Sequence, residues 1–251
     1  MLLPLMWLRK KKLDRLLKDY PLYDPPHKVE ERVLPKEKAQ ENFDYFMRVR
    51  KERVAFFSRW LKDEFGVAIG PTQRGVEALN RWMFRYGGLL LPNRTVEKSY
   101  FTYDPPWRGE GAGCNVVFDV GIAFGEFLIA NCPNLRWDMD PISALRPNEA
   151  RILKREFGSS FWRPELTGFE NPHWGVNPLH DTYLYATQLE DVVTFAGMKK
   201  LHACYTPGSW DILYTSLVTN FSRKIEEYEA GDPATLYGSA GIPADLEDDD
   251  E

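Results

Sequence analysis

The 251-residue sequence predicts an α+β protein in which long helices pack on a small, mostly antiparallel sheet within a single main domain. Long stretches of the chain place apolar side chains at helical spacing, and shorter apolar runs between them are bounded by Gly and Pro. Hydrophobic residues make up 43% of the chain and charged residues 27%, which is typical of a globular protein with a substantial core.

Three helices are predicted in the first third of the chain. Residues 5–17 place five leucines on roughly one stripe among lysines and arginines, which is typical of a short amphipathic helix. Residues 35–65 predict the clearest helix, with Pro35 suited to the first turn and Gly66 to the stop. Residues 72–86 predict a third helix, which a pair of glycines ends.

The middle of the chain is expected to supply the sheet and a central helix. Residues 89–91 and 97–103 are predicted to be strands, followed by a loop rich in Gly and Pro over 104–113. Residues 115–131 are apolar on nearly every side of a helix, so we expect them to form the buried central helix. Residues 135–139 predict a further strand.

The last hundred residues mix loops with shorter elements. We predict a short helix over 148–157, a loop that includes at most one strand over 158–180, and a strand over 182–188. A final amphipathic helix is predicted over 208–230, where a Gly-Asp-Pro sequence ends it. Residues 232–251 contain few large apolar side chains and are expected to be a disordered acidic tail.

The net charge of −5 is distributed unevenly. Residues 1–20 hold six basic and two acidic side chains, a net of +4, and residues 245–251 hold six acids and no base, a net of −6. The body between them is close to balance, so we expect no nucleic-acid partner. The chain divides into a basic arm (1–29), a single α+β domain (30–231) and the acidic tail (232–251).

The sequence predicts a cytoplasmic protein. We expect no apolar stretch that approaches the roughly 18–20 residues needed to span a bilayer. The basic cluster near the N-terminus follows the first apolar residues, whereas the charges of a signal peptide precede them. Three cysteines are an odd number and do not form a disulfide framework, which favours a reducing compartment.

Two carboxylates on the expected central helix are the candidate catalytic residues. Asp119 and Glu126 lie seven residues apart, so they share a helix face. Buried carboxylates are costly unless they are paired, and acid/base or metal chemistry is one explanation for them. The alternative is that an arginine, such as Arg136, or backbone donors pair with each of them. Gly121 and Gly125 on the same helix would let another backbone approach closely.

The stretch from about residue 116 to 137 resembles a pattern of small bacterial α+β domains. The resemblance rests on Gly121, Gly125, Glu126 and Trp137, which form a helix with Gly-x-x-x-Gly-Glu followed by a strand that carries Trp. Many such domains have no known function, and some lie beside toxins as immunity proteins. The resemblance implies this fold neighbourhood and a protein-binding role.

Two other sequence patterns bear on ligand binding and on internal repeats. The glycine-rich residues 109–113 lack the Gly-Lys-Ser/Thr of a nucleotide-binding loop, and the four histidines and three cysteines show no standard metal-ligand spacing, so we predict neither a cofactor nor a metal. The Tyr-Asp-Pro-Pro sequence occurs at 23–26 and again at 103–106. Either the chain carries a partial duplication or two extended segments met the same local need, and we favour the second.

Aromatic side chains in predicted loops and at one predicted strand are the candidate recognition residues, because Trp and Tyr dominate interface hot spots. They are Trp107, Trp162, Trp174 and Tyr183. The alternative is that they pack beneath long loops. The leading functional prediction is protein–protein interaction, as an immunity or accessory factor, and we lean against an enzyme. The alternatives are a hydrolase that uses Asp119 and Glu126, and a factor that associates with a membrane surface through residues 1–20.

Overall fold

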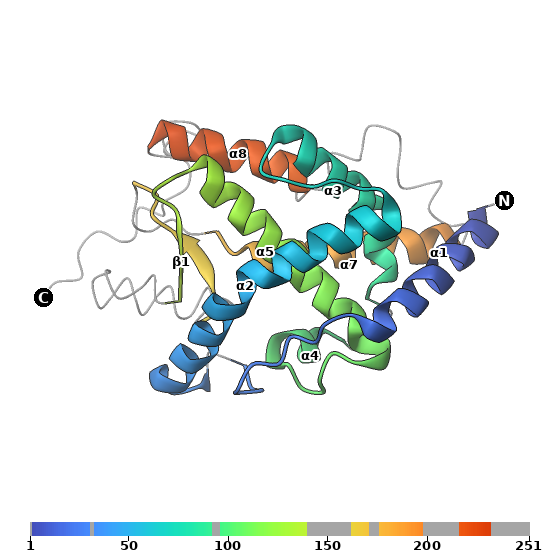
Figure 1. The fold of residues 1–251 in the computed structure, drawn as a ribbon, viewed down its shortest axis with the longest axis horizontal. Coiled ribbons are helices and arrows are strands. Elements are labelled where there is room, and N and C mark those ends of the chain that lie inside the picture. The colour runs from blue at the N-terminus through green and yellow to red at the C-terminus, as the bar shows by residue number, and fades with distance from the viewer. Residues whose placement is uncertain are drawn as a thin grey trace, which may run out of the picture.

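The computed structural model describes residues 2–30, 33–91, 96–139, 162–170, 176–197 and 216–231. These residues form a mostly helical α+β structure with a small two-stranded antiparallel sheet, which confirms the predicted fold class. Figure 1 shows the helices gathered around one that runs diagonally through the middle of the molecule, with the strands at one end.

The three helices predicted in the first third of the chain are confirmed. They are α1 (Leu2–Leu16), α2 (Lys36–Phe65) and α3 (Gln73–Tyr86). The end of α2 follows from Gly66, which adopts a left-handed conformation with φ 66°. The start of α3 is capped by the Thr72 side chain, which accepts a backbone hydrogen bond from the first turn.

Two predicted strands do not form. The run predicted at 89–91 overlaps a 3₁₀ turn (Gly87–Leu89), and the run at 97–103 is α4 (Val96–Thr102). Short apolar runs fit a strand and a buried helix equally well, and here contacts with other helices decide. The glycine-rich loop after α4 forms another 3₁₀ turn (Gly109–Ala112), so it joins two helices and does not follow a strand.

The strand predicted at 182–188 is also wrong, because these residues lie inside α7 (Pro178–Gly197). The segment contains two tyrosines, which favour strands. The buried residues Leu179, Tyr183 and Ala186 instead follow a spacing of three to four, which is that of one helix face. Tertiary packing on this face overrides the strand preference of the tyrosines.

The sheet consists of β1 (Arg136–Asp138) and β2 (Glu165–Thr167). The first was predicted as a strand, and the second lies in the segment predicted to be a loop with at most one strand. Trp137 faces Leu166 across the antiparallel pair, and both are buried. The sheet is therefore attached to the helical core through this face.

The C-terminal part is described over α8 (Leu217–Ala230), which lies within the helix predicted at 208–230. The predicted helix at 148–157 and the predicted acidic tail at 232–251 lie outside the described residues.

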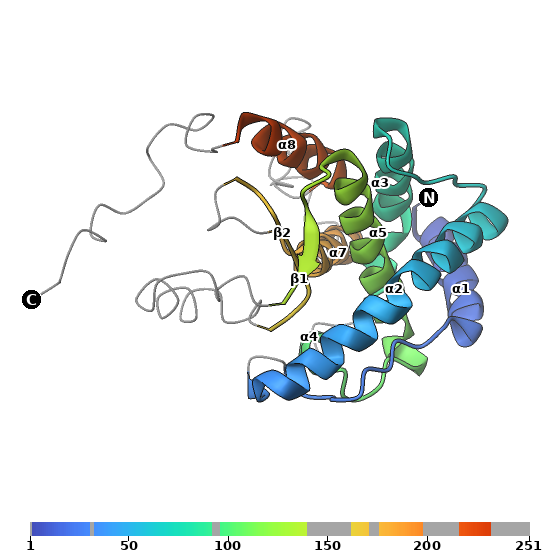
Figure 2. The ribbon, with the colours of Figure 1, turned by 60° about the vertical axis from the view of Figure 1, so that its left-hand side comes forward.

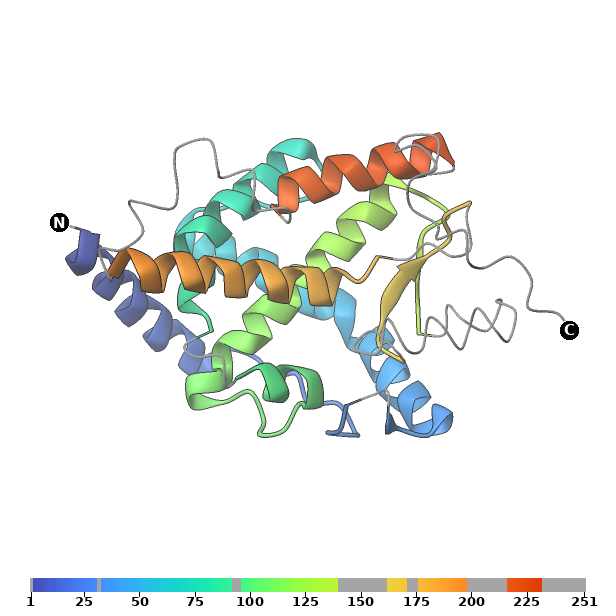
Figure 3. The same ribbon diagram turned by 180° about the vertical axis from the view of Figure 1, so that it is seen from behind.

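The central helix is α5 (Gly113–Asn131), as predicted. It packs against α2 on one face (Figure 1) and against α7 on the opposite face (Figure 3), with α8 crossing near its end. By length and composition alone, the segment Gly109–Asn131 could cross a membrane. This corrects our expectation that the chain has no apolar stretch long enough to span a bilayer. The most apolar window of the segment is 89% buried inside the protein, as in the core helix of a globular fold.

Two glycines of α5 allow the close contacts that the sequence predicted. A Cβ at Gly121 would lie 2.9 Å from the Cα of Leu179, so α7 crosses α5 at this point. A Cβ at Gly125 would lie 2.2 Å from Cζ2 of Trp137, so the indole ring of β1 occupies the space that a side chain would fill. Close packing around both glycines fixes α7 and the sheet on α5.

The two Tyr-Asp-Pro-Pro segments differ in backbone conformation but lie next to each other. Tyr103 has a positive φ of 57°, which Tyr23 does not share. The two tyrosine rings approach to 5.6 Å between centroids, and both contact Trp107. The difference in backbone conformation favours two independent segments over a duplication. What the segments share is the packing of their tyrosine rings on Trp107.

Replacing Gly125 by Ala tests the contact with Trp137. The added methyl group has no room, so we expect Gly125→Ala to lower the free energy of unfolding by about 1–3 kcal/mol in urea titrations. The matched control is Gly111→Ala, where the added carbon would meet no described residue within 4 Å beyond its chain neighbours. The control should change stability by less than about 1 kcal/mol. Equal stability of both variants would contradict the packing of Trp137 on α5.

Candidate functional site

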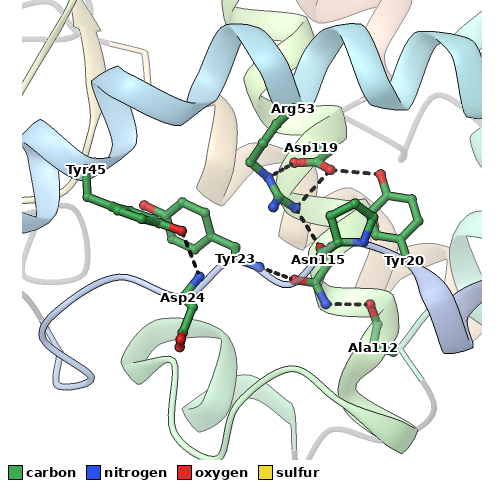
Figure 4. A network of polar contacts seen from close by, with 9 residues as sticks. Tyr20, Tyr23, Asp24, Tyr45, Arg53, Ala112, Asn115 and Asp119 are labelled. Carbon is green, nitrogen blue, oxygen red and sulfur yellow. Dashed lines mark hydrogen bonds and ion pairs between the residues drawn. The ribbon is translucent and has the colours of Figure 1, made fainter.

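Asp119, the first candidate catalytic residue, is buried in a polar network (Figure 4). Its side chain is 1% exposed. Arg53 of α2 donates to both carboxylate oxygens, from Nε at 2.6 Å and from Nη2 at 3.0 Å. The hydroxyl of Tyr20, which follows α1, donates to Oδ2 at 2.8 Å. The carboxylate is thus paired with one cation and one neutral donor, both brought from other parts of the chain.

The network also holds the segment after α1 on the core. Arg53 donates to the carbonyl of Pro21 at 3.3 Å, and the backbone N–H of Tyr23 donates to Oδ1 of Asn115 at 2.7 Å. Asn115 in turn donates to the carbonyls of Trp107 and Ala112 (Figure 4 shows the second of these). Backbone groups that lack a helix or strand partner are satisfied in this way by side chains of α2 and α5.

Glu126, the second candidate, has its own arginine. Its Oε1 accepts from Nε of Arg50 at 3.0 Å and from the indole Nε1 of Trp137 at 2.8 Å. Arg50 and Arg53 lie three residues apart on one side of α2, so this helix supplies a cation to each carboxylate of α5. Both carboxylates are therefore paired with an arginine, although the partners are Arg50 and Arg53 and not the exposed Arg136.

Burial and pairing act in opposite directions on the charges of this network. Burial raises the pKa of Asp119, while Arg53 and Tyr20 oppose that rise by stabilising the carboxylate. Burial alone would lower the pKa of Arg53, but the Asp119 carboxylate raises it above its ordinary value. Burial and then Asp119 hold the pKa of Tyr20 well above its usual range, so its hydroxyl remains a donor.

The geometry of the carboxylates fits a fastening role better than a catalytic one. A general acid or base must reach the proton that it transfers, and Asp119 is enclosed by its own partners. Within the residues that the structure describes, no group of three or more His, Cys, Asp or Glu is placed to hold a metal ion. The carboxylates instead join α2, the sheet and the segment after α1 to α5.

The candidate recognition residues have different positions. Trp107 is 2% exposed and Tyr183 is 4% exposed, and both stack on Tyr100, with ring centroids 5.4 Å and 4.5 Å away. Neither can meet a partner in this structure, which corresponds to the packing alternative. Trp162 is half-buried, with Nζ of Lys36 5.5 Å from its ring centre. Trp174 lies outside the described residues.

The first half of α1 exposes an apolar surface that the recognition prediction did not include. Leu5 is 46% exposed, Trp7 57% and Leu8 56%, whereas Leu13 and Leu17 further along are buried. The sequence shows a continuous leucine stripe, which does not reveal that the protein covers one end of it and leaves the other open.

A groove lies beside this surface, and we call it the basic groove. It is a cavity of about 670 Å³ between the end of α1, the turn from α2 to α3, and α3 itself. Its basic side chains are Lys12, Arg74, Arg81 and Arg85. Its aromatic side chains are Phe65, Trp82 and Tyr86. The basic side chains of α1 and α3 line one cavity because the two helices lie next to each other. The spacing of these residues in the sequence does not predict that contact.

One further titratable group stands out, at the sheet. Glu165 of β2 lies directly opposite Asp138 of β1 and is nearly buried. Burial, and then the Asp138 carboxylate, raise the pKa of Glu165 to about 8. Opposed like charges across an antiparallel pair are destabilising, so protonation of Glu165 stabilises the sheet.

No family model, curated protein or solved structure matches the chain. The resemblance to small bacterial domains therefore remains a prediction from four residues. Three of these residues meet in space, since Trp137 covers Gly125 and donates to Glu126, and the fourth, Gly121, is the crossing point of α7.

Replacing Asp119 by Asn tests the fastening role. Asp119→Asn leaves the buried Arg53 without a counter-charge, so we expect a loss of about 3–5 kcal/mol in the free energy of unfolding. The double variant Arg53→Met with Asp119→Asn buries no charge and should lose less than the sum of the two single variants. Glu126→Gln removes a more exposed ion pair and should cost about 1 kcal/mol. Additive losses in urea titrations would contradict the pairing.

The pKa of Glu165 predicts a pH dependence of stability. Because the folded-state pKa of about 8 lies above that of the unfolded chain, the folded protein keeps a proton that the unfolded chain loses. Stability should then fall as pH rises from about 4 to about 8. We expect Glu165→Gln to exceed the parent by a few kcal/mol at pH ~9 and to match it near pH ~4 in urea unfolding. Glu52→Gln, at an exposed position of α2, is the control and should show no such trend.

Proposed function

We propose that the protein acts by binding another protein through the first half of α1. The observation that carries the proposal is the exposure of Leu5, Trp7 and Leu8 on a helix whose other end is buried by Leu13 and Leu17. Exposed apolar residues that lie close together on one element are a common mark of interaction surfaces. We call these three side chains the α1 face; Leu5 and Leu8 lie on neighbouring sides of the helix, and Trp7 lies about 100° around the helix from Leu8.

The chemistry of the α1 face supports a protein partner. Tryptophan is among the residues most enriched in interface hot spots, and Trp7 is the most exposed side chain of the three. Nζ of Lys11 lies 4.0 Å from the centre of the Trp7 ring, so a cation borders the apolar surface. Such a border would steer and orient an acidic partner.

Stoichiometric binding requires no reacting group, and this agrees with the enclosed position of Asp119. A hydrolase that uses Asp119 and Glu126 is less well supported, because each carboxylate is held by an arginine. Within the binding function, the role of an immunity or accessory factor is what the resemblance of residues 116–137 implies.

Association with a membrane surface is the second candidate, and the same face favours it. A basic amphipathic helix with Trp and Leu on its apolar side is typical of interfacial binding. The α1 face has these side chains, with Lys10 and Lys11 beside them. We place protein binding first because Lys12, one helical turn after Leu8, lines the basic groove, and the groove is a concave site with aromatic side chains and not a flat one.

A variant of the α1 face tests the proposed function. In Leu5→Ser/Trp7→Ser/Leu8→Ser the exposed apolar area is lost, so we expect the partner recovered by affinity purification from the producing cells to fall by about tenfold or more. The matched control is Val29→Ser/Val33→Ser, which removes exposed apolar side chains elsewhere and should recover the partner fully. Circular dichroism checks that both variants fold.

Two results would count against protein binding through this face. Equal recovery of the partner by the α1-face variant and the parent would show that the face is not used. Flotation of the parent with anionic vesicles, lost in the α1-face variant and without any recovered protein, would favour the membrane candidate.

A further inference from the structure

We propose that the basic groove binds an acidic peptide segment of the partner protein, with carboxylates on Lys12, Arg74 and Arg85 and apolar side chains on the aromatic wall. The inference rests on the proposed function, because the groove adjoins the α1 face and would contact the same partner. Figure 2 shows α1 on the side of the molecule away from the two strands, so this surface is separate from the sheet.

Three cations of the groove are available to a ligand. Among the described residues, Arg74 and Arg85 form no ion pair, and both are exposed. Lys12 touches the backbone carbonyl of Glu64 and lies 4.4 Å from the centre of the Phe65 ring, and within the same residues it pairs with no carboxylate. Arg81, by contrast, is paired with Glu77 at 3.6 Å. The lining thus has three available positive charges and one acidic residue, Glu64, and this excess of positive charge favours an anionic ligand.

Trp82, one of the residues that line the groove, carries a buried donor. Trp82 is almost fully buried, and its indole Nε1–H has no hydrogen-bond partner among the residues that the structure describes. A buried N–H without a partner is costly, so native structures nearly always satisfy it. This atom has almost no accessible surface, so a ligand in the groove would reach it only if the indole ring moved.

The aromatic wall distinguishes a peptide from a simple anion. Phe65 packs edge to face on Trp82 and on Tyr86, and a small anion in the groove would not use these rings. An adjoining hollow of about 450 Å³ shares Arg81 and Arg85 and adds Arg9 and Phe84, so the mixed basic and aromatic surface continues toward α1. A segment in which acidic and apolar residues alternate matches both kinds of side chain along this path.

The test measures binding of defined peptides by fluorescence anisotropy with the full-length chain. The probe is a labelled peptide of about eight alternating Glu and Leu residues, and its control has Gln in place of Glu, so only charge differs. We expect the Glu peptide to bind about tenfold more tightly than the Gln peptide and to lose affinity as salt rises.

Paired variants show where the probe binds. Arg74→Gln/Arg85→Gln removes two groove charges and should weaken binding of the Glu peptide by about tenfold. Lys51→Gln/Arg59→Gln removes two exposed charges of α2 outside the groove and should stay within about twofold of the parent. Equal binding of both peptides, or an unchanged affinity of the Arg74/Arg85 variant, would overturn the proposal. So would binding of phosphatidylserine vesicles in place of the peptide.

The outcome separates this inference from the proposed function. The α1-face variant should still bind the Glu peptide, because its substitutions lie outside the groove. If the parent fails to bind the peptide while the α1 face still recovers the partner, the groove is wrong and the proposed function stands. If the parent binds the peptide but the α1-face variant recovers as much partner as the parent, the groove proposal is supported and the proposed docking face is wrong.

Discussion

The ion pair between Arg53 and Asp119 is the contact on which the arrangement of the helices depends. The central helix is apolar on nearly every side, and a lone carboxylate within it would be strongly unfavourable. Pairing with Arg53 requires α2 to cross α5 at this turn, and the Tyr20 hydroxyl requires the segment after α1 to lie beside the same carboxylate. One buried charge thereby fixes three parts of the chain relative to each other.

The same constraint determines which surfaces remain open. The segment after α1 is held by Tyr20 and Tyr23 on α5, and further along by His27, whose backbone exchanges two hydrogen bonds with the side chain of Asn42 on α2. Because this segment is anchored and Leu13 is buried, α1 projects with its first half uncovered. The basic groove arises where the end of α1 meets α3. Both proposed binding surfaces are thus consequences of how the N-terminal arm is fastened.

The candidate site was partly visible in the sequence. The spacing of Asp119 and Glu126 correctly places both carboxylates on the central helix, and the need for a partner follows from burial alone. The identity of the partners does not, because Arg53 and Arg50 lie 66 and 76 residues away in the chain. Many arginines occur along α2, and no local rule selects two of them. The wrong choice of Arg136 shows that closeness in sequence is a poor guide to a long-range ion pair.

The sequence by itself determined the fold class, the three N-terminal helices, the central helix and the strand that carries Trp137, because apolar periodicity, capping residues and glycine stops act locally. Tertiary structure decided the state of the short aromatic runs around Tyr100 and Tyr183, which stack on each other between α4 and α7. It also decided which aromatic side chains are buried and which half of α1 is exposed. These properties depend on what lies across the core, and residues distant in the chain supply it.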